Sequence, residues 1–511
     1  MTMIWLPEAI VLAGALASLA YGVLGRRSSP RAAMDLALAF TLAALLATAA
    51  LSGTVVEAFA GAFRIDGVTL SFQLLLLVGT ALTLLLARED VGAPAPATGG
   101  AAASGGVPAE HAGEYAGLLL LAALGGMLIA AAADLLLLFL GLELVSIAGY
   151  ALVGFRKGDP LSTQAAVKYV LTGATATGVF VFGLSYLIGL TGTTDVYAAG
   201  EVIASPGFME RYGRLIFLAF LFLFIGAAYK IAAFPFHLWA PDVYRGAPTP
   251  VTMFLAVVSK AAGLALIVRL YLGAFAWTNW VGANGLRESF LLKSGPIVAL
   301  VSGFSMVLGS VLALRTRDVK RLFAYAGIAH AGYLLVPLAA PNPSMLDQIV
   351  FYLLAYLLAT AGAFAVLRRV TEENGTSDLK AFAGLYHRAP WSAWALLLFF
   401  LSLAGIPLTM GFFGKWYLLV GAAWGGHGLL ATLIVVTSVM SYAYYFAVLK
   451  QAFLRPGPTE RPIRFSGAEV AVVLIAAAGV LLGGLLPGEV LRTIARAFDA
   501  AHFFGLYDGR L

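Results

Sequence analysis

The sequence of 511 residues contains no cysteine. This absence excludes disulfide bonds, thiolate zinc sites, cysteine-ligated iron–sulfur clusters and c-type haem attachment. Six histidines are present, but only His237 and His330 lie well inside apolar stretches, which argues against a haem held by two histidines. We therefore expect no cofactor in this chain.

Charge is also scarce. Only 11% of the residues are charged, against about 25% in a soluble domain, and 61% are hydrophobic. So few charges cannot cover a surface that faces water, and the sequence therefore indicates an integral membrane protein. The opening MTMIWLPEAI has no basic stretch before its apolar residues, so we expect a retained helix there and not a signal peptide.

Apolar stretches long enough to span a bilayer, about 20 residues each, recur along the chain. Their number predicts an all-α integral membrane protein of about 14 transmembrane helices, mostly joined by short loops. The expected spans are approximately 5–25, 33–52, 68–87, 115–133, 135–155, 163–190, 214–240, 250–273, 294–314, 322–340, 346–367, 391–420, 424–449 and 468–486.

The loops between these spans indicate the orientation of the chain. If the N-terminus lies outside, most lysines and arginines of the loops fall on the inner side, as the positive-inside rule requires. We therefore expect both termini outside. Residues 89–113, rich in Gly, Ala and Pro, are predicted to be a flexible inside loop after an N-terminal three-helix segment, 1–88. Residues 450–511 are predicted to hold the last helix and an outer tail.

Several ionisable residues fall far from any expected helix end. A lysine or an acid at the bilayer centre costs at least ~2.5–3.5 kcal/mol, so such residues are usually functional or paired. The alternatives are packing ion pairs for the charged residues and hydrogen-bonded packing for the histidines. The candidate site residues are Glu143, Lys168, Lys230, Lys260, Lys415, His237 and His330.

Proline marks two of these positions. Pro235 follows Lys230 by five residues, and Pro407 precedes Lys415, each inside one expected span. Proline removes a backbone donor and clashes with the preceding turn, so both spans are expected to be broken. Broken membrane helices leave free backbone groups and dipole ends that bind ions or water.

Depth separates the remaining candidates. Lys260 lies about ten residues into its span, whereas Lys168 is near the inner end of its own span and can snorkel to the interface. Arg269 lies nearer the outer end and is interpreted as an interface anchor. Glu143 has no basic neighbour within one turn, so any partner must come from another helix.

These residue types suit proton transfer. Burial disfavours the charged form of a lysine, and a nearby carboxylate favours it. At ~4 Å and an effective dielectric of about 20, such a pair is worth about 4 kcal/mol. Movement of Glu143 relative to Lys230 would therefore switch the lysine between holding and releasing a proton, and histidines and water can bridge between lysines. One carboxylate among several lysines favours protons over sodium, which needs oxygen clusters.

The spans also predict an internal repeat. Residues 114–273 and 294–449 each hold five spans, the fourth to eighth and the ninth to thirteenth, and five is odd, so the second block is inverted relative to the first. The proline-broken helix stands fourth in each block. Inverted repeats with broken helices near the midplane are the layout of many transporters.

Five segments carry a family resemblance. They are LFLGLELVSIAGYALVGF, QAAVKYVLTGA, YKIAAFPFHLWAPDVYRGAPTPVTMFLAVVSKAAG, RDVKRLFAYAGIAHAGYLL and LAGIPLTMGFFGKWYLL. The chain resembles the antiporter-like membrane subunits of bacterial respiratory complex I (NADH:quinone oxidoreductase), specifically the subunit N type. The resemblance implies a proton-translocating, non-redox subunit of the bacterial inner (plasma) membrane that assembles with other membrane subunits. Further subunits would carry NADH, flavin and iron–sulfur clusters, which agrees with the lack of a G-x-G-x-x-G loop here.

The resemblance also implies residue roles. The family pairs the glutamate at position 143 with the lysine at position 230, and Lys260 and Lys415 complete the path. A lysine at position 415 fits subunit N. The chain departs from the family near His330, where relatives often have serines and this sequence has Ala326 and Gly327. This difference weakens the case for a chain of hydroxyl groups there. Arg245 stands where many relatives have an acid.

Other functions stay open. A subunit of a multisubunit Na⁺/H⁺ antiporter would share this fold, although the stretch DVYRGAPTPV argues against it. A scaffold whose charges only hold helices together is a second alternative. A related complex that uses another electron donor is a third, and this chain does not discriminate between donors.

Overall fold

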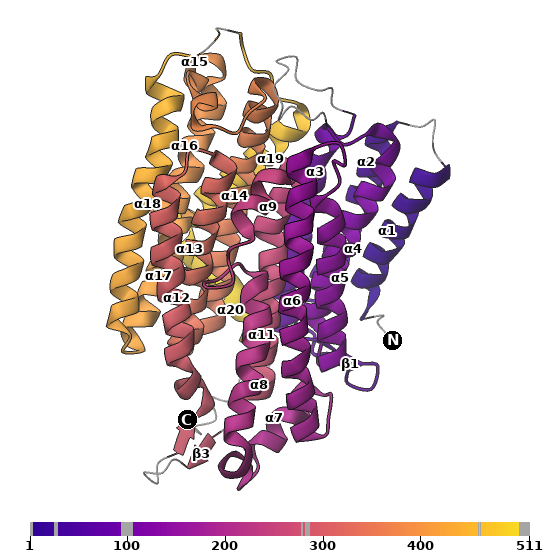
Figure 1. Ribbon diagram of the computed structural model, residues 1–511, viewed down its shortest axis with the longest axis vertical. Helices are drawn as coiled ribbons and strands as arrows, with labels where there is room; N and C mark the ends of the chain where they lie inside the picture. The colour runs from indigo at the N-terminus through magenta and orange to yellow at the C-terminus, as the bar shows by residue number, and fades with distance from the viewer. Residues whose placement is uncertain are drawn as a thin grey trace.

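The computed structural model is built almost entirely of helices (Figure 1). It describes residues 4–24, 29–92, 106–276, 279–281, 287–457, 459 and 461–499. Within these ranges, thirteen helices are long and apolar enough to cross a membrane, so the predicted all-α membrane fold is confirmed. They are α1 (Leu6–Leu24), α2 (Pro30–Ala50), α3 (Gly67–Asp90), η1 with α4 (Ala109–Ala131), α5 (Leu135–Val153), α6 (Pro160–Thr191), α8 (Phe208–Lys230), α10 to η3 (Thr249–Phe275), α12 (Phe290–Arg315), α13 (Val319–Ala339), α14 (Met345–Asn374), α18 (Gly428–Leu454) and α19 (Gly467–Leu485).

The remaining expected span, 391–420, is two helices of 15 residues each, α16 (Pro390–Ala404) and α17 (Met410–Trp424). The count of fourteen spans and the inverted repeat stay predictions. Residues 93–105 of the expected inside loop, and the tail beyond residue 499, lie outside the described residues.

Short polar side chains determine where several helices begin. Asp66, Asp134 and Asp318 each accept a hydrogen bond from a backbone N–H in the first turn of α3, α5 and α13, and Ser466 does the same for α19. Such N-caps satisfy donors that a helix start leaves free and contribute about 1 kcal/mol each.

Both proline-containing spans are broken, as predicted. α8 ends at Lys230, the chain turns through residues 231–239, and α9 (Ala240–Gly246) follows. Ala232 in this turn has a φ of 57°, which costs a residue with a side chain about 1–2 kcal/mol. α16 ends at Ala404 and is followed by Gly405, whose φ of 85° suits glycine, and the turn to α17 holds Leu408 at a φ of 72°. Both breaks leave helix-end carbonyl groups inside the bundle.

A further interruption was not predicted. The span 249–275 consists of α10 (Thr249–Phe254), a π-helical turn η2 (Leu255–Ser259), α11 (Lys260–Leu270) and a second π-helical turn η3 (Tyr271–Phe275). π-Helical turns are rare and frequently lie at functional sites. Lys260 is the first residue after the first of them.

Short elements lie at the two ends of the bundle. The hairpin β3–β4 and α7 are at one end, with β1–β2 on the same side, and α15 is at the other end (Figure 1). Their bounds are β1 (Val56–Ala58), β2 (Phe63–Ile65), α7 (Val196–Ala204), β3 (Asn279–Val281), β4 (Arg287–Ser289), η4 (Leu379–Phe382), α15 (Leu385–Arg388) and α20 (Pro487–Asp499).

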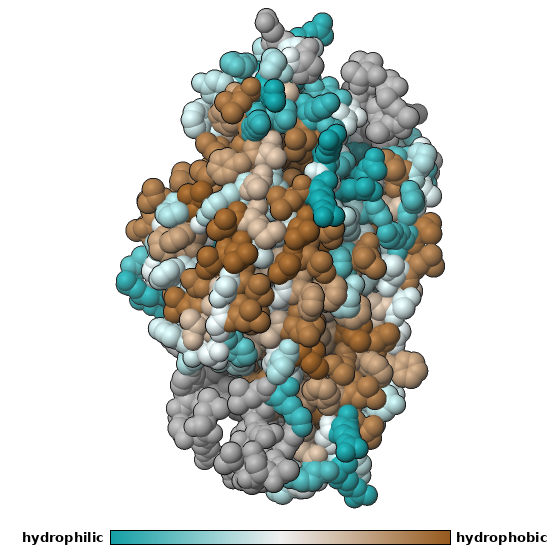
Figure 2. All heavy atoms as spheres, turned by 60° about the vertical axis from the view of Figure 1, so that its left-hand side comes forward, coloured by the Kyte–Doolittle hydropathy of each residue, from teal (hydrophilic) through white to brown (hydrophobic). Residues whose placement is uncertain are grey.

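Burial increases toward the centre of the bundle. The span 249–275, α13 and α14 are almost completely buried, whereas α1, α2 and α6 are only about one third buried. α11 packs against α4 and α8, and α13 packs against α9, α12 and α14. The face shown in Figure 2 is mostly hydrophobic across its middle, and hydrophilic residues gather toward its ends, as lipid contact requires. The central helices are the ones that carry Lys260 and His330.

Candidate functional site

Lys230 and Glu143 lie near each other without forming an ion pair. The Lys230 side chain is 3% exposed, and its Nζ donates a hydrogen bond to Ser146 Oγ at 3.1 Å. Ser146 lies one turn after Glu143 on α5. The partly exposed Glu143 accepts a hydrogen bond from Thr177 Oγ1 of α6 at 2.8 Å. Glu143 still acts on the charge of Lys230, but the hydroxyl of Ser146, and not a carboxylate oxygen, contacts the ammonium group.

The break after Lys230 is held by hydrogen bonds to its free backbone groups. The N–H of Phe234 donates to Ser305 Oγ of α12 at 2.9 Å, and Trp239 Nε1 donates to the carbonyl of Tyr229 at 3.1 Å. His237 is buried in this turn, and its Nδ1 has no hydrogen-bond partner within the described residues. The structure therefore brings His237 to the break, and among the described residues no hydrogen bond joins it to Lys230.

Lys260 continues the row of buried bases from α8 to α11. The stem of Lys230 packs against Gly263, one turn after Lys260, where an added Cβ would come within 3.1 Å of Lys230 Cβ. Lys260 is 2% exposed, and its Nζ donates to the carbonyl of Gly327 on α13. Its Nζ also lies 5.2 Å from the centroid of the Tyr356 ring, a cation–π distance. Glycine at position 327 leaves room for this contact, because a Cβ there would lie 3.3 Å from Lys260 Nζ.

His330 lies one turn further along α13 and is almost completely buried. Its Nδ1 is 2.6 Å from the hydroxyl of Tyr352, and its Nε2 is 3.4 Å from the hydroxyl of Tyr445. The imidazole centroid lies 4.7 Å from the ring of Tyr356, which faces Lys260 Nζ, and 5.7 Å from the ring of Tyr333, which faces Lys415 Nζ. His330 is therefore flanked by the rings on which the two lysines lie.

Lys415 completes the row at the second broken span. Its Nζ donates to the carbonyl of Ala404 at 3.0 Å, a group freed where α16 ends. The same Nζ lies 4.9 Å from the centroid of the Tyr333 ring on α13. The stem of Lys415 runs past Gly405, where an added Cβ would lie 2.9 Å from Lys415 Cδ. The break thus supplies both an acceptor for the ammonium group and the space that its stem occupies.

Lys168 is placed away from this row. Its Nζ contacts Asp242 of α9, whose other oxygen accepts a hydrogen bond from Arg321 at 2.8 Å. The Lys168 and Asp242 side chains are 38% and 40% exposed. Burial alone would raise the pKa of Asp242, but the hydrogen bond and charge of Lys168, with the charge of Arg321, lower it. Lys168 therefore belongs to a partly exposed ion cluster, which agrees with its predicted place near a helix end.

Arg269 is not an interface anchor, and that prediction was wrong. Its side chain is 1% exposed and donates to both carboxylate oxygens of Asp66, at 2.7 and 2.6 Å. Its Nε donates to the carbonyl of Ala130 at 2.7 Å. Burial would raise the pKa of Asp66, but the charge and hydrogen bonds of Arg269 lower it. Because Asp66 lies about 200 residues away in sequence, spacing gave no signal for this pair.

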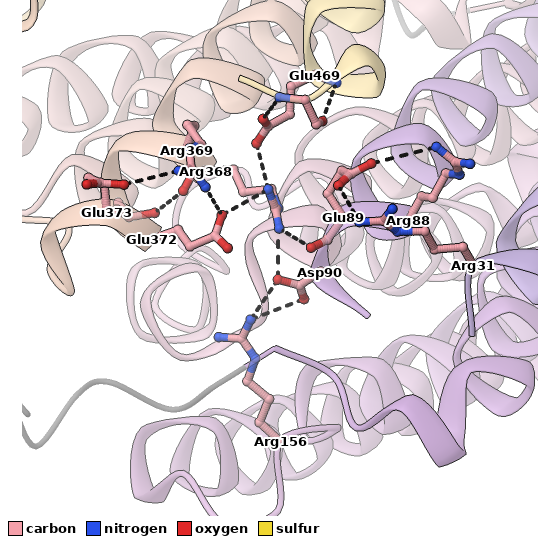
Figure 3. A network of polar contacts seen from close by, with 12 residues as sticks. Arg31, Arg88, Glu89, Asp90, Arg156, Arg368, Arg369, Glu372, Glu373 and Glu469 are labelled. Carbon is pink, nitrogen blue, oxygen red and sulfur yellow. Dashed lines mark hydrogen bonds and ion pairs between the residues drawn. The ribbon is translucent and has the colours of Figure 1, made fainter. Parts of the chain in front are cut away.

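A second buried arginine was also missed. Arg368 of α14 donates to Glu469 of α19 at 2.6 Å and lies 3.9 Å from Asp90 at the end of α3. Asp90 in turn accepts a hydrogen bond from Arg156 at 2.9 Å. Figure 3 shows these side chains pointing toward one another from four separate segments. Arg368 directly follows the expected span 346–367, but α14 continues to Asn374, so Arg368 is a helical residue, and it is buried.

The row of bases is lined by tyrosines that sequence reasoning did not select. Tyr352 and Tyr356 are four residues apart and therefore share one face of α14. This spacing of hydroxyl-bearing residues in mid-span was the signal available for them. The structure joins Lys230, Lys260, His330 and Lys415 through neighbouring contacts. Among the described residues, no group of three or more His, Asp and Glu side chains is placed to hold a metal ion.

Comparisons with known proteins agree with one another. Residues 132–441 match the family model described as "NADH:quinone oxidoreductase/Mrp antiporter, TM". The chain is 45% identical over 442 residues to a Brevibacillus brevis protein named NADH-quinone oxidoreductase subunit N, covering 86% of this chain and 84% of that protein. It is 43% identical over 494 residues to a Geobacillus kaustophilus protein of the same name, covering 96% of each. A chain of the Thermus thermophilus respiratory complex I with bound aureothin matches with a TM-score of 0.77 at 33% identity, covering 96% of this chain and 99% of that one.

Proposed function

This chain belongs to the family of NADH:quinone oxidoreductase and Mrp antiporter membrane subunits, and we propose that it is the subunit N of a bacterial NADH:quinone oxidoreductase. In that complex it moves protons across the membrane and assembles with other membrane subunits. The family model covers antiporter subunits as well, but the two relatives described above, at 45% and 43% identity, carry the oxidoreductase name. The identity therefore favours the oxidoreductase over a sodium–proton antiporter.

The observation that carries the proposal is the row of four buried bases, Lys230, Lys260, His330 and Lys415. Each is almost completely buried, and each lysine donates to a hydroxyl or carbonyl oxygen, not to a carboxylate. A buried lysine without a paired carboxylate is costly to keep charged, so a proton can leave it. Such groups in series form a path along which protons can pass through ordered water.

Glu143 sets the proton affinity at the start of this path. In the structure its carboxylate is held by Thr177, and Lys230 is held by Ser146. When Glu143 turns toward Lys230, the attraction strengthens the hold of the lysine on its proton. When Glu143 turns away, Lys230 releases the proton toward Lys260. The partial exposure of Glu143 in the isolated chain agrees with a neighbouring membrane subunit that covers this side of α5.

The chain takes no direct part in electron transfer. The absence of cysteine supports this part of the proposal, because the chain cannot bind cysteine-ligated iron–sulfur clusters. NADH oxidation is assigned to other subunits of the complex. His237 lies at the break and is assigned a supporting role in the path, because its Nδ1 is buried without a partner among the described residues. Lys168 is assigned to the inner surface and not to the central row.

The deciding experiment is proton pumping by the assembled complex with Lys230→Ala. We expect fewer protons moved per NADH oxidised in reconstituted vesicles, with normal assembly of the complex. Lys450→Ala is the matched control, because Lys450 is exposed on α18 and should leave pumping unchanged. If Lys230→Ala instead blocks assembly and any assembled fraction pumps normally, the lysine is a scaffold residue. Pumping that stops when sodium is removed would favour the antiporter alternative.

The topology follows as part of the same proposal. Both termini lie outside the bacterial plasma membrane, and residues 114–273 and 294–449 form two inverted repeats. The breaks between α8 and α9 and between α16 and α17 support the repeat, since each is fourth in its block. Because the chain has no cysteine, single cysteines report orientation directly. We expect Ser205→Cys to react with an impermeant thiol reagent from outside and Thr376→Cys only from inside.

A further inference from the structure

His330 has a phenol hydroxyl at each of its two ring nitrogens. The hydroxyl of Tyr352 is 2.6 Å from Nδ1, and that of Tyr445 is 3.4 Å from Nε2. All three side chains are almost completely buried. The tyrosines come from α14 and α18, so two separate helices converge on one imidazole near the centre of the bundle.

This arrangement matches what an imidazole needs in order to pass a proton. A neutral imidazole carries one N–H, so one nitrogen donates a hydrogen bond and the other accepts one, while a hydroxyl does either. A proton taken up at one nitrogen gives an imidazolium, and loss of the proton from the other nitrogen restores a neutral ring with its hydrogen moved across. A flip of the ring, together with rotation of the two hydroxyls, then returns the site to its starting state.

Tyr352 lies on the side of Lys415. It packs against α17 at Gly414, where an added Cβ would lie 2.7 Å from Tyr352 Cδ2, and Gly414 immediately precedes Lys415. The Tyr352 ring centroid is 6.0 Å from that of Tyr333, the ring beneath Lys415 Nζ. The hydroxyl at Nδ1 of the histidine therefore belongs to a residue that contacts the second broken span.

Lys260 approaches His330 from another direction. Its Nζ donates to the carbonyl of Gly327, one turn before the histidine on α13. The Tyr356 ring lies beneath Lys260 Nζ, with its centroid 4.7 Å from that of the imidazole. The histidine thus lies beside the rings that face the two lysines. The hydroxyl of Tyr352 is at its Nδ1, and that of Tyr445 is at its Nε2.

The helix that carries His330 offers no hydroxyl of its own in the preceding turn. Residues 326 and 327 are alanine and glycine, which left a hydroxyl chain near His330 doubtful from the sequence. The structure supplies hydroxyls from α14 and α18 instead. Packing alone can bury a tyrosine without giving its hydroxyl a partner. Tyr115 is an example, because its buried hydroxyl has no hydrogen-bond partner within the described residues.

We infer that Tyr352 and Tyr445 are positioning residues of the proton path. They hold the His330 ring with Nδ1 at Tyr352, which packs on the Lys415 side, and with Nε2 at Tyr445 of α18, so that the imidazole can take up a proton at one nitrogen and release one from the other. The inference rests on the proposed function, because it specifies how protons cross from Lys260 to Lys415.

The test is proton pumping by the assembled complex carrying Tyr352→Phe, Tyr445→Phe or both. Each change removes one oxygen and keeps the ring that packs against its neighbours. We expect Tyr352→Phe to cause at least half of the loss in protons per NADH that His330→Ala causes, and the double variant to match His330→Ala. The pH profile of pumping should also shift, because one imidazole nitrogen loses its partner. Tyr115→Phe is the matched control and should leave both readouts unchanged.

The outcomes separate this inference from the function on which it rests. If the double variant pumps with the wild-type ratio and pH profile while His330→Ala is impaired, the tyrosines only pack and the inference is overturned. If His330→Ala and Lys260→Ala also pump normally, the proposed function itself fails. If the Tyr352→Phe chain does not assemble into the complex, the test depends on the pH profile of proton pumping by Tyr445→Phe. An unchanged pH profile overturns the inference.

Discussion

The ion pair between Asp66 and Arg269 offers the clearest prediction from the structure. Both side chains are at most 1% exposed, and the guanidinium donates to both carboxylate oxygens. Asp66 also caps α3 by accepting from the N–H of Thr69 at 2.9 Å. Changing Asp66 to Ala therefore leaves a buried arginine without its counter-charge and removes a helix cap.

The expected loss can be worked from these contacts. Removal of one partner of a buried ion pair costs about 3–5 kcal/mol, and loss of an N-cap costs about 1 kcal/mol. We expect Asp66→Ala to destabilise the chain by roughly 4–6 kcal/mol. Asp66→Asn keeps a good capping residue and loses only the charge, so its effect should be smaller. Asp66→Leu with Arg269→Leu should recover part of the loss, because buried ion pairs are often replaceable by apolar residues.

The assay is the susceptibility of this chain to proteolysis during stepwise heating of the purified complex. The matched control is Asp35→Ala, since Asp35 pairs with Arg88 at 2.7 Å while 50% exposed, and such surface pairs contribute about 0–1 kcal/mol. A loss in Asp66→Ala no larger than in Asp35→Ala would refute the reasoning. So would a double variant that is less stable than Asp66→Ala.

The pH dependence has a definite sign. Arg269 lowers the pKa of Asp66 in the folded chain, whereas the unfolded value is about 3.9. The pair therefore contributes its full stability above that unfolded value and loses it as the pH falls through the lower folded value. The stability difference between wild type and Asp66→Asn should persist from neutral pH down to about 4 and shrink only below it.

Three further predictions follow from other contacts. Arg368→Ala leaves Glu469, which is 1% exposed, buried without its arginine, so it should destabilise the chain by about 3–5 kcal/mol in the same proteolysis assay, and a change within about 1 kcal/mol would contradict the buried network of Figure 3. Lys168→Ala should reduce pumping far less than Lys260→Ala, because Lys168 lies in a partly exposed ion cluster, and equal losses would return it to the central path. Gly405→Val should impair pumping strongly, since position 405 has a φ of 85° and an added Cβ would press on the stem of Lys415, and wild-type pumping would show that this break tolerates a side chain.

The sequence predicted the features that depend on local chemistry. Pro235 and Pro407 predicted both broken spans, because a proline lacks the backbone N–H and so disrupts the helix in which it lies. The depth of Lys230, Lys260 and Lys415 in apolar stretches predicted their burial. The placement of Lys168 near a helix end likewise agreed with its partly exposed ion cluster.

The features that were missed depend on how helices rotate and pack against one another. Arg269 is buried because it pairs with Asp66, which caps the start of α3 and is far from Arg269 in the sequence. No sequence spacing predicts that these two residues meet. The hydroxyl of Ser146, and not Glu143, contacts Lys230, because the rotation of α5 decides which of two residues one turn apart faces α8. In the sequence, Tyr352 and Tyr445 look like ordinary aromatic core residues. Their contacts with His330 depend on how α13, α14 and α18 pack together. The π-helical turn before Lys260 had no distinctive residue pattern.

The central claim is that Lys230, Lys260, His330 and Lys415 are linked by groups that can carry a proton. The most direct measurement is electron cryo-microscopy of the assembled complex at a resolution that shows ordered water. We predict water or hydroxyl groups at hydrogen-bond distance in every gap of the row, with the four side chains facing the interior of the bundle. A dry, apolar gap between any two of them that persists in every state of the turning-over complex would contradict the account, as would any of the four side chains facing lipid.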